Sequence, residues 1–373
     1  MTGIALQEGT PLVMPIKAGQ PADSRHDRRR WVVGVDTHTD THAAALVDAL
    51  GDVHAQIEVS ADPDGYARLL AWAGEHLPAG QRMFWAVEGT RAHGHGLTRM
   101  LQAAGHQVIE AVPPVRGSRR RGGKSDRLDA IHAARTALVN DHPSTPRADG
   151  PREALRLLVT TRQHYSTTRT ATINVFKSVI LGATELREQL RRLPTTAQVR
   201  TVLTLPEPDT ADVEERVRLQ QLKILAQTIA DLDAVLAANY QQLENLVRQL
   251  CPALLELPGV GPHSAAVALT AWSHHSRLRD EAAFAALAGA APLPASSGRH
   301  QRHRLNRGGD RTLNAALHTI VTTRRRMKHT ATSTYIARRT AEGLTPKEIL
   351  RCLKRYTARQ LFRIMQTTPH ATT

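Results

Sequence analysis

Residues 31–40, WVVGVDTHTD, decide the fold of the N-terminal part of the chain, because an apolar run here ends in Asp36. A second apolar run, RMFWAVEGT at residues 82–90, ends in Glu88 in the same way. A carboxylate at the exit of a buried strand is held by rigid backbone. Two more acidic residues, Asp126 and Asp129 in KSDRLDA, lie three apart at the start of an expected helix, which puts both on one face. These four carboxylates predict a common site.

Four carboxylates in one place call for a cation, because their mutual repulsion would otherwise raise their pKa values. Oxygen-only ligands favour Mg²⁺ or Mn²⁺, and two such ions about 4 Å apart can clamp the attacking and leaving oxygens of a phosphodiester. Any one of the four residues alone is better explained as a solvated carboxylate at a strand end or helix N-terminus, since Asp and Glu favour the first turn of a helix. The combination predicts a metal site formed by Asp36, Glu88, Asp126 and Asp129.

The order of elements around these residues is α/β. Two strands, at residues 41–49 and 53–60, flank a turn at Leu50-Gly51-Asp52 that suits a hairpin. A helix is expected over residues 65–77, and a helix and a short strand are expected to follow the Glu88 strand before the Asp126 helix. Three antiparallel strands, a helix, and then alternating strands and helices predict an RNase H-like fold.

The chain divides into four predicted regions. Residues 1–30 are polar, end in a basic cluster and read as a mobile tail, and residues 31–145 form the α/β domain. Residues 151–250 have few glycines and predict two long helices, the second with near-heptad apolar spacing typical of a coiled coil. Residues 251–365 form a mostly α-helical C-terminal domain. The apolar residues of this second helix form a seam that could pack against another copy of the chain or be buried within one chain. The candidate seam residues are Leu219, Leu222, Leu225, Ile229 and Leu232.

Composition restricts the partners. A formal net charge of +15 on 373 residues and a pI near 10.7 call for a polyanion, and nucleic acid is the simplest candidate. The sequence has no apolar run of about 18 residues, which argues against a membrane protein. Cys251 and Cys352 are far apart and have neither the spacing of a zinc site nor that of a disulfide framework. We therefore expect a cytoplasmic protein in a reducing compartment.

Two basic segments are candidate nucleic-acid contacts. The first, RGSRRRGGK, directly precedes the Asp126 helix, where a flexible basic loop could carry a phosphate backbone to the metals; a solvated loop is the alternative. The second follows Ser296-Ser297-Gly298, where a Gly-flanked serine beside arginines could attack a phosphate; a structural turn is the alternative. The basic residues concerned are Arg116, Arg119, Arg120, Arg121 and Lys124 in the first segment, and Arg299, Arg302, Arg304 and Arg307 in the second.

A glycine-containing turn opens the C-terminal region. The sequence LPGVG at residues 257–261 resembles a helix-hairpin-helix element, whose glycines let backbone N–H groups approach a phosphate. A tight turn between two packed helices would use the same residues.

The chain resembles the DEDD insertion-sequence transposases now called bridge recombinases. The resemblance is carried by motifs that occur in this order: VGVDTH, AVEGT, KSDRLDA, LPGVGP and the segments G-x-A-P, S-S-G and R-G-G-D-R. The resemblance runs over residues 31–365. The DEDD part alone also resembles RuvC, the Holliday-junction resolvase.

The resemblance implies a RuvC-like N-terminal domain, a coiled-coil connector and a C-terminal transposase domain with a nucleophilic serine. Ser297, directly before Gly298, matches that serine, with Ser296 as the neighbouring alternative. The resemblance also implies a covalent phosphoserine intermediate, Mg²⁺ or Mn²⁺ at the four carboxylates, and a structured noncoding bridge RNA that pairs with donor and target double-stranded DNA. A homodimer or homotetramer and a bacterial, nucleoid-associated location are expected with it.

Three other functions compete. A RuvC-like structure-specific DNA endonuclease would need the acidic tetrad and the basic surface but no covalent serine. An actin-like sugar kinase also begins with a strand that ends in Asp, but it would carry Gly-rich phosphate loops and would be less basic. A binding protein without catalysis would leave the four carboxylates without a purpose.

Overall fold

The structure is a computed structural model that describes residues 30–111, 125–140, 143–206, 212–294, 303–304, 306 and 308–368. The chain forms two compact units, residues 1–146 and residues 147–373. Residues 1–29 of the predicted tail lie outside the described residues, and Arg30 is the first residue of a strand. Among the described residues no helix is long and apolar enough to cross a membrane.

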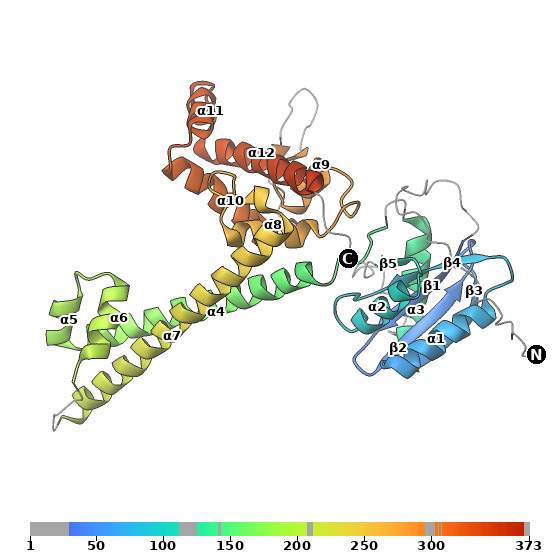
Figure 1. Ribbon diagram of the computed structural model, residues 1–373, viewed down its shortest axis with the longest axis horizontal. Helices are drawn as coiled ribbons and strands as arrows, with labels where there is room; N and C mark the ends of the chain where they lie inside the picture. The colour runs from blue at the N-terminus through green and yellow to red at the C-terminus, as the bar shows by residue number, and fades with distance from the viewer. Residues whose placement is uncertain are drawn as a thin grey trace, which may run out of the picture. The chain divides into compact units, whose positions relative to one another are not determined.

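A five-stranded sheet in the order β3-β2-β1-β4-β5 forms the centre of the N-terminal unit (Figure 1). The first three strands are antiparallel and the last two run parallel to β1. This mixed sheet agrees with the expected RuvC-like, RNase H-like arrangement. The strands are β1 (Arg30–Thr37), β2 (Thr41–Val47), β3 (Val53–Ser60), β4 (Arg82–Val87) and β5 (Val108–Glu110).

Helices cover both faces of this sheet. On one face, α1 (Pro63–His76) and α2 (His95–Ala103) pack on Val33, Val35 and Trp85, and on the other face α3 (Asp126–Val139) packs on Val32 and Ala86. Alternate residues of a strand point to opposite faces, so the even-numbered residues of β1 and β4 face α3. Asp62 caps α1 by accepting a hydrogen bond from the Gly65 amide at 2.7 Å.

The second unit begins with two long helices, α4 (Pro151–Leu181) and α7 (Val213–Leu250), which lie side by side (Figure 1). They are antiparallel, because the start of α4 shares a cluster with the end of α7 and the end of α4 shares one with its beginning. The seam residues Leu222 and Ile229 are buried against Phe176 and two short helices, α5 (Thr184–Leu190) and α6 (Thr195–Thr204). The apolar pattern is therefore used, at these positions, for packing within the chain.

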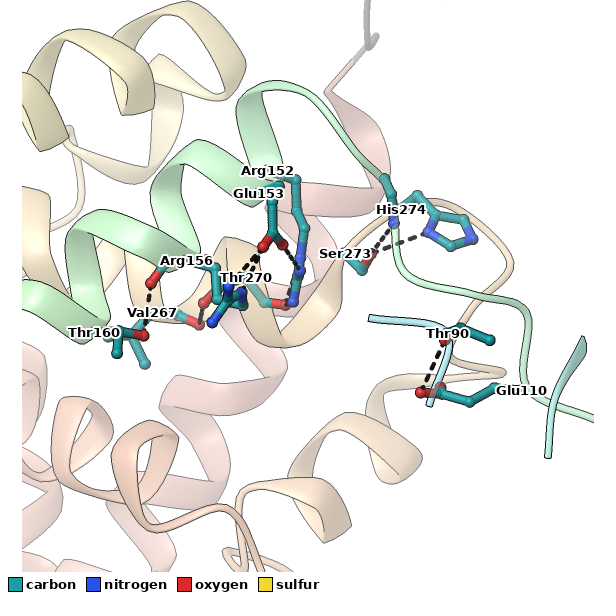
Figure 2. Close-up of polar contacts among 11 residues, drawn as sticks. Thr90, Glu110, Arg152, Glu153, Arg156, Thr160, Val267, Thr270, Ser273 and His274 are labelled. Carbon is teal, nitrogen blue, oxygen red and sulfur yellow. Dashed lines mark hydrogen bonds and ion pairs between the residues drawn. The ribbon is translucent and has the colours of Figure 1, made fainter. Parts of the chain in front are cut away.

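The remaining helices surround a core built on α8 (Pro262–Trp272), which is apolar on nearly every side. A buried arginine ties this helix to the start of α4: the Arg152 guanidinium donates to the Thr270 carbonyl at 2.7 Å and to the Glu153 carboxylate at 3.0 Å (Figure 2). The other elements are the 3₁₀ turn Pro252–Leu254, α9 (Glu281–Leu287), β6 (Leu293–Pro294), β7 (His303–Arg304), α10 (Arg311–Arg326), α11 (Thr330–Ala341) and α12 (Pro346–Thr367).

Candidate metal centre of the N-terminal unit

Asp36 lies at the end of the central strand and points towards α3. It is paired with Ala43 of β2 and is only 6 % exposed. Gly34, two residues earlier on the same face, has no room for a side chain, because a Cβ there would lie 2.1 Å from the Ala130 carbonyl oxygen of α3. The missing side chain lets the helix approach β1 closely, and this approach brings the first turn of α3 to the strand end.

The first turn of α3 supplies the second part of the site. Ala130, Ala134 and Ala137 form the buried stripe of this helix against the sheet. Asp126 precedes Ala130 by four residues and therefore continues the same stripe beyond the apolar core. The helix thus directs a carboxylate, and not an apolar side chain, to the end of β1.

Asp36 and Asp126 are brought together around His38. The His38 Nε2 atom lies 3.2 Å from a carboxylate oxygen of each residue, and one ligand atom from each of the three lies within 4.8 Å of the other two. His38 and Asp126 are both partly exposed, whereas Asp36 is buried. His38 is not among the ligands that the sequence predicts. The signal that could have identified it is its spacing of two from Asp36, because residues i and i+2 of an extended chain lie on the same side.

The negative charge at Asp36 is only partly compensated by its neighbours. Burial raises the pKa of Asp36 above its usual value, and the negative charges of Asp129 and Asp126 raise it further. His38 opposes this shift, both by its charge and by its hydrogen bond to the Asp36 carboxylate. A divalent cation would offset both the repulsion and the cost of burying the carboxylate, so the residues present fit such an ion.

The other two predicted ligands are placed less closely. Asp129 acts on Asp36 through its charge but contributes no atom to the group of three. Glu88 follows β4 directly: its amide donates to the Val35 carbonyl at 2.9 Å and its carbonyl accepts from the Thr37 hydroxyl at 2.9 Å. The backbone of Glu88 is therefore fixed beside the end of β1, on the parallel neighbour of that strand, although its carboxylate is not among the three grouped ligands.

The other predicted site residues fall mostly outside the described part of the chain. These are Ser296 and Ser297, the first basic segment with Arg116, Arg119, Arg120, Arg121 and Lys124, and, in the second segment, Arg299, Arg302 and Arg307. Arg304 lies in β7, which pairs antiparallel with β6 through Leu293.

The LPGVG turn is packed against α10. Gly259 has a φ of +76°, and a Cβ there would lie 3.0 Å from the Ile320 carbonyl oxygen. The Arg324 guanidinium donates to the Pro258 carbonyl at 2.7 Å, and to the side chain of Gln360. At Gly259 the turn therefore requires glycine, because its backbone has a positive φ and lies against α10.

Comparison with known protein families indicates the class of this protein. A family model of DEDD transposases matches residues 33–184, and a second, described as Transposase IS116/IS110/IS902 family, matches residues 251–337. Both describe transposases, which are enzymes that act on DNA. The first match contains Asp36, Glu88, Asp126 and Asp129, and the second spans Ser297.

The two matches follow one another along the chain and together cover more than half of it. The chain belongs to the IS110 family of transposases. No curated protein sequence matches the chain.

Proposed function

We propose that this transposase cleaves and rejoins DNA strands through a covalent serine intermediate, with a divalent cation, Mg²⁺ or Mn²⁺, held at the centre around Asp36. The observation that carries the metal part is the convergence of Asp36, His38 and Asp126 on one point at the end of β1. When bound, the cation would neutralise charge on the reacting phosphate and activate the attacking oxygen. Glu88 and Asp129 complete the proposed ligand set.

The protein residues have separate roles in this proposal. Asp36 is held by the strand and Asp126 by the helix, so the two carboxylates keep a fixed spacing for the ion. His38 could serve as a third ligand, because its Nε2 atom already faces both carboxylates. The basic residues that flank the two sites, from Arg116 to Lys124 and from Arg299 to Arg307, would hold the phosphate backbone.

The proposed chemical step uses the hydroxyl of Ser297. Its oxygen forms a bond to phosphorus, the bond from phosphorus to one deoxyribose oxygen breaks, and the serine proton passes to the released sugar oxygen or to solvent. Attack by the sugar hydroxyl of another strand reverses the step and frees the serine. The number of phosphodiester bonds is conserved, so the reaction needs no nucleotide cofactor.

Support for the serine comes from the C-terminal half of the chain. A DEDD-type centre does not itself use a serine, and the N-terminal match alone would suit a RuvC-like endonuclease that uses water. The resemblance of the segment around Ser297 to the serine-bearing half of the bridge recombinases favours the serine over water, and the second family match covers this segment. We further propose that a bridge RNA selects donor and target DNA by base pairing and that the protein works as a dimer or tetramer, as the resemblance implies.

The test traps the intermediate. Ser297→Ala should eliminate both recombination and the covalent protein–DNA species detected on a denaturing gel with labelled DNA, because no other oxygen replaces the hydroxyl. Ser296→Ala is the matched control and should keep both. Loss of the adduct in Ser296→Ala alone would move the nucleophile by one residue. Cleavage without any attached protein in the unmodified enzyme would establish water as the nucleophile and favour the endonuclease.

A further inference from the structure

The positive charge of this protein is concentrated at its C-terminal end. Residues 311–373 contain thirteen Lys and Arg residues and only two acidic residues, Glu342 and Glu348, whereas the whole chain has a net charge of +15. These residues include α10, α11 and α12, and α12 is the longest of the three. Most of the excess charge therefore lies on helices that the sequence interpretation did not single out.

Five basic residues follow one another at intervals of four along α12. They are Lys347, Arg351, Arg355, Arg359 and Arg363. Residues four apart are neighbours on a helix, so these side chains form one continuous row, which we call the α12 row. Each step of four residues turns the side-chain direction by about 40°, so the row winds by about 160° around α12 from its first residue to its last. At 1.5 Å per residue the row is about 24 Å long.

Packing fixes the direction of the α12 row. The other side of α12 is apolar, and Leu353, Ala358, Leu361 and Phe362 are buried. Lys347 and Arg351 are exposed, and the side chain of Arg363 is 68 % exposed. A helix held on one side in this way presents the basic side chains at the surface of the unit.

One residue of α9 restrains three of the five side chains of the α12 row. Glu281, the first residue of α9, pairs with the guanidinium of Arg359 at 2.5 Å and with that of Arg363 at 3.2 Å. Arg355 donates to the Glu281 backbone carbonyl at 3.1 Å. Glu281 thus restrains three arginines, two through its carboxylate and one through its backbone carbonyl, and its single negative charge does not neutralise them. Part of the entropy cost of ordering long side chains is therefore met before any ligand binds.

We propose that the α12 row binds the phosphate backbone of double-stranded DNA. Arginine and lysine rows bind phosphates through charge, and a length of about 24 Å is enough to reach phosphates on both sides of a major groove that is about 12 Å wide. The wide groove of DNA suits a helix better than the deep, narrow major groove of an RNA duplex. The inference rests on the action of the family on DNA and is independent of the identity of the nucleophile.

The test is the salt dependence of binding to a labelled duplex of arbitrary sequence, measured by fluorescence anisotropy. Each lost phosphate contact lowers the slope of log K against log salt by about 0.9. The double variant Lys347→Gln/Arg351→Gln avoids the arginines that pack on α9 and should reduce the slope by about 2. It should also weaken binding at low salt, while its thermal midpoint stays close to that of the unmodified protein.

The matched control is Arg191→Gln/Arg248→Gln. Both arginines are exposed in the same unit, at 51 % and 61 %, and each pairs with a glutamate of its own segment. This variant loses the same charge and should keep the slope. Equal slopes for the two double variants would overturn the proposal, and so would a reduced slope on an RNA hairpin with an unchanged slope on duplex DNA. Ser297→Ala should bind DNA with the unmodified slope, so a failure of the serine chemistry would not be mistaken for a failure of the α12 row.

Discussion

The two units of this transposase bury charge in opposite ways. In the second unit, the buried arginines Arg152 and Arg324 each donate to backbone carbonyls and to a side-chain oxygen. In the first unit, the buried Asp36 is repelled by Asp126 and Asp129 and only partly compensated by His38. A buried charge with a full set of partners stabilises a junction, whereas like charges gathered at a strand end cost stability and indicate a site for a ligand.

The largest expected effect is on DNA cleavage, and it tests whether the buried Asp36 belongs to a functional site. Asp36→Asn should reduce DNA cleavage by about 100-fold or more, because the amide removes a charged metal ligand while the strand stays intact. Cleavage of labelled DNA at saturating Mg²⁺ measures the loss. The control is Asp40→Asn, an exposed acidic residue just beyond the same strand, which should keep full activity. DNA binding should survive in both variants, and retained cleavage in Asp36→Asn would remove Asp36 from the site.

The second prediction tests whether the buried Arg324 of the second unit stabilises the fold. Arg324→Met should destabilise the protein by about 2–3 kcal/mol, because the Pro258 carbonyl and the Gln360 amide oxygen lose a charged donor in a buried place. Chemical denaturation followed by circular dichroism measures the change in unfolding free energy. Arg325→Met, the exposed neighbour on the same helix, should change it by less than about 0.5 kcal/mol. Similar values for the two variants would show that the buried arginine is not a structural anchor.

The smallest expected effect is on stability, and here removing the buried charge should stabilise the protein, whereas removing Arg324 should destabilise it. The folded-state pKa of Asp36 is raised above 3.8, so the folded protein binds this proton more tightly than the unfolded chain does. The unfolding free energy therefore falls as pH rises from about 3.8 through the folded-state pKa, and the full penalty is present above it. Without metal, Asp36→Asn should raise the thermal midpoint at neutral pH, and the gain should disappear at acidic pH.

Adding a divalent metal ion gives a further test of the stability effect at Asp36. Mg²⁺ or Mn²⁺ should raise the thermal midpoint of the unmodified protein, because an ion that binds only the folded state stabilises it, and should raise that of Asp36→Asn much less. If Asp36→Asn is less stable than the unmodified protein in the absence of metal, the carboxylate contributes to folding and the contrast between the two units fails.

Much of the fold was predictable because it depends on local periodicity. The apolar run that ends in Asp36 and the hairpin turn at residues 50–52 predicted β1, β2 and β3, and the apolar spacing over residues 65–77 predicted α1. The two long helices follow from an uninterrupted helical pattern over 151–181 and 213–250. The near-heptad pattern could not say whether Leu222 and Ile229 pack within the chain or between chains, since both bury the same side chains.

The sequence by itself determined which residue types stand at the strand end and at the first turn of α3, because each position is set by a pattern a few residues long. Only the tertiary structure decided that Asp36 and Asp126, ninety residues apart, share one histidine while the Glu88 carboxylate stands outside the group of three. That outcome depends on how closely α3 approaches β1. The approach is set by the contact of Gly34 with Ala130, and no local pattern in the sequence records it.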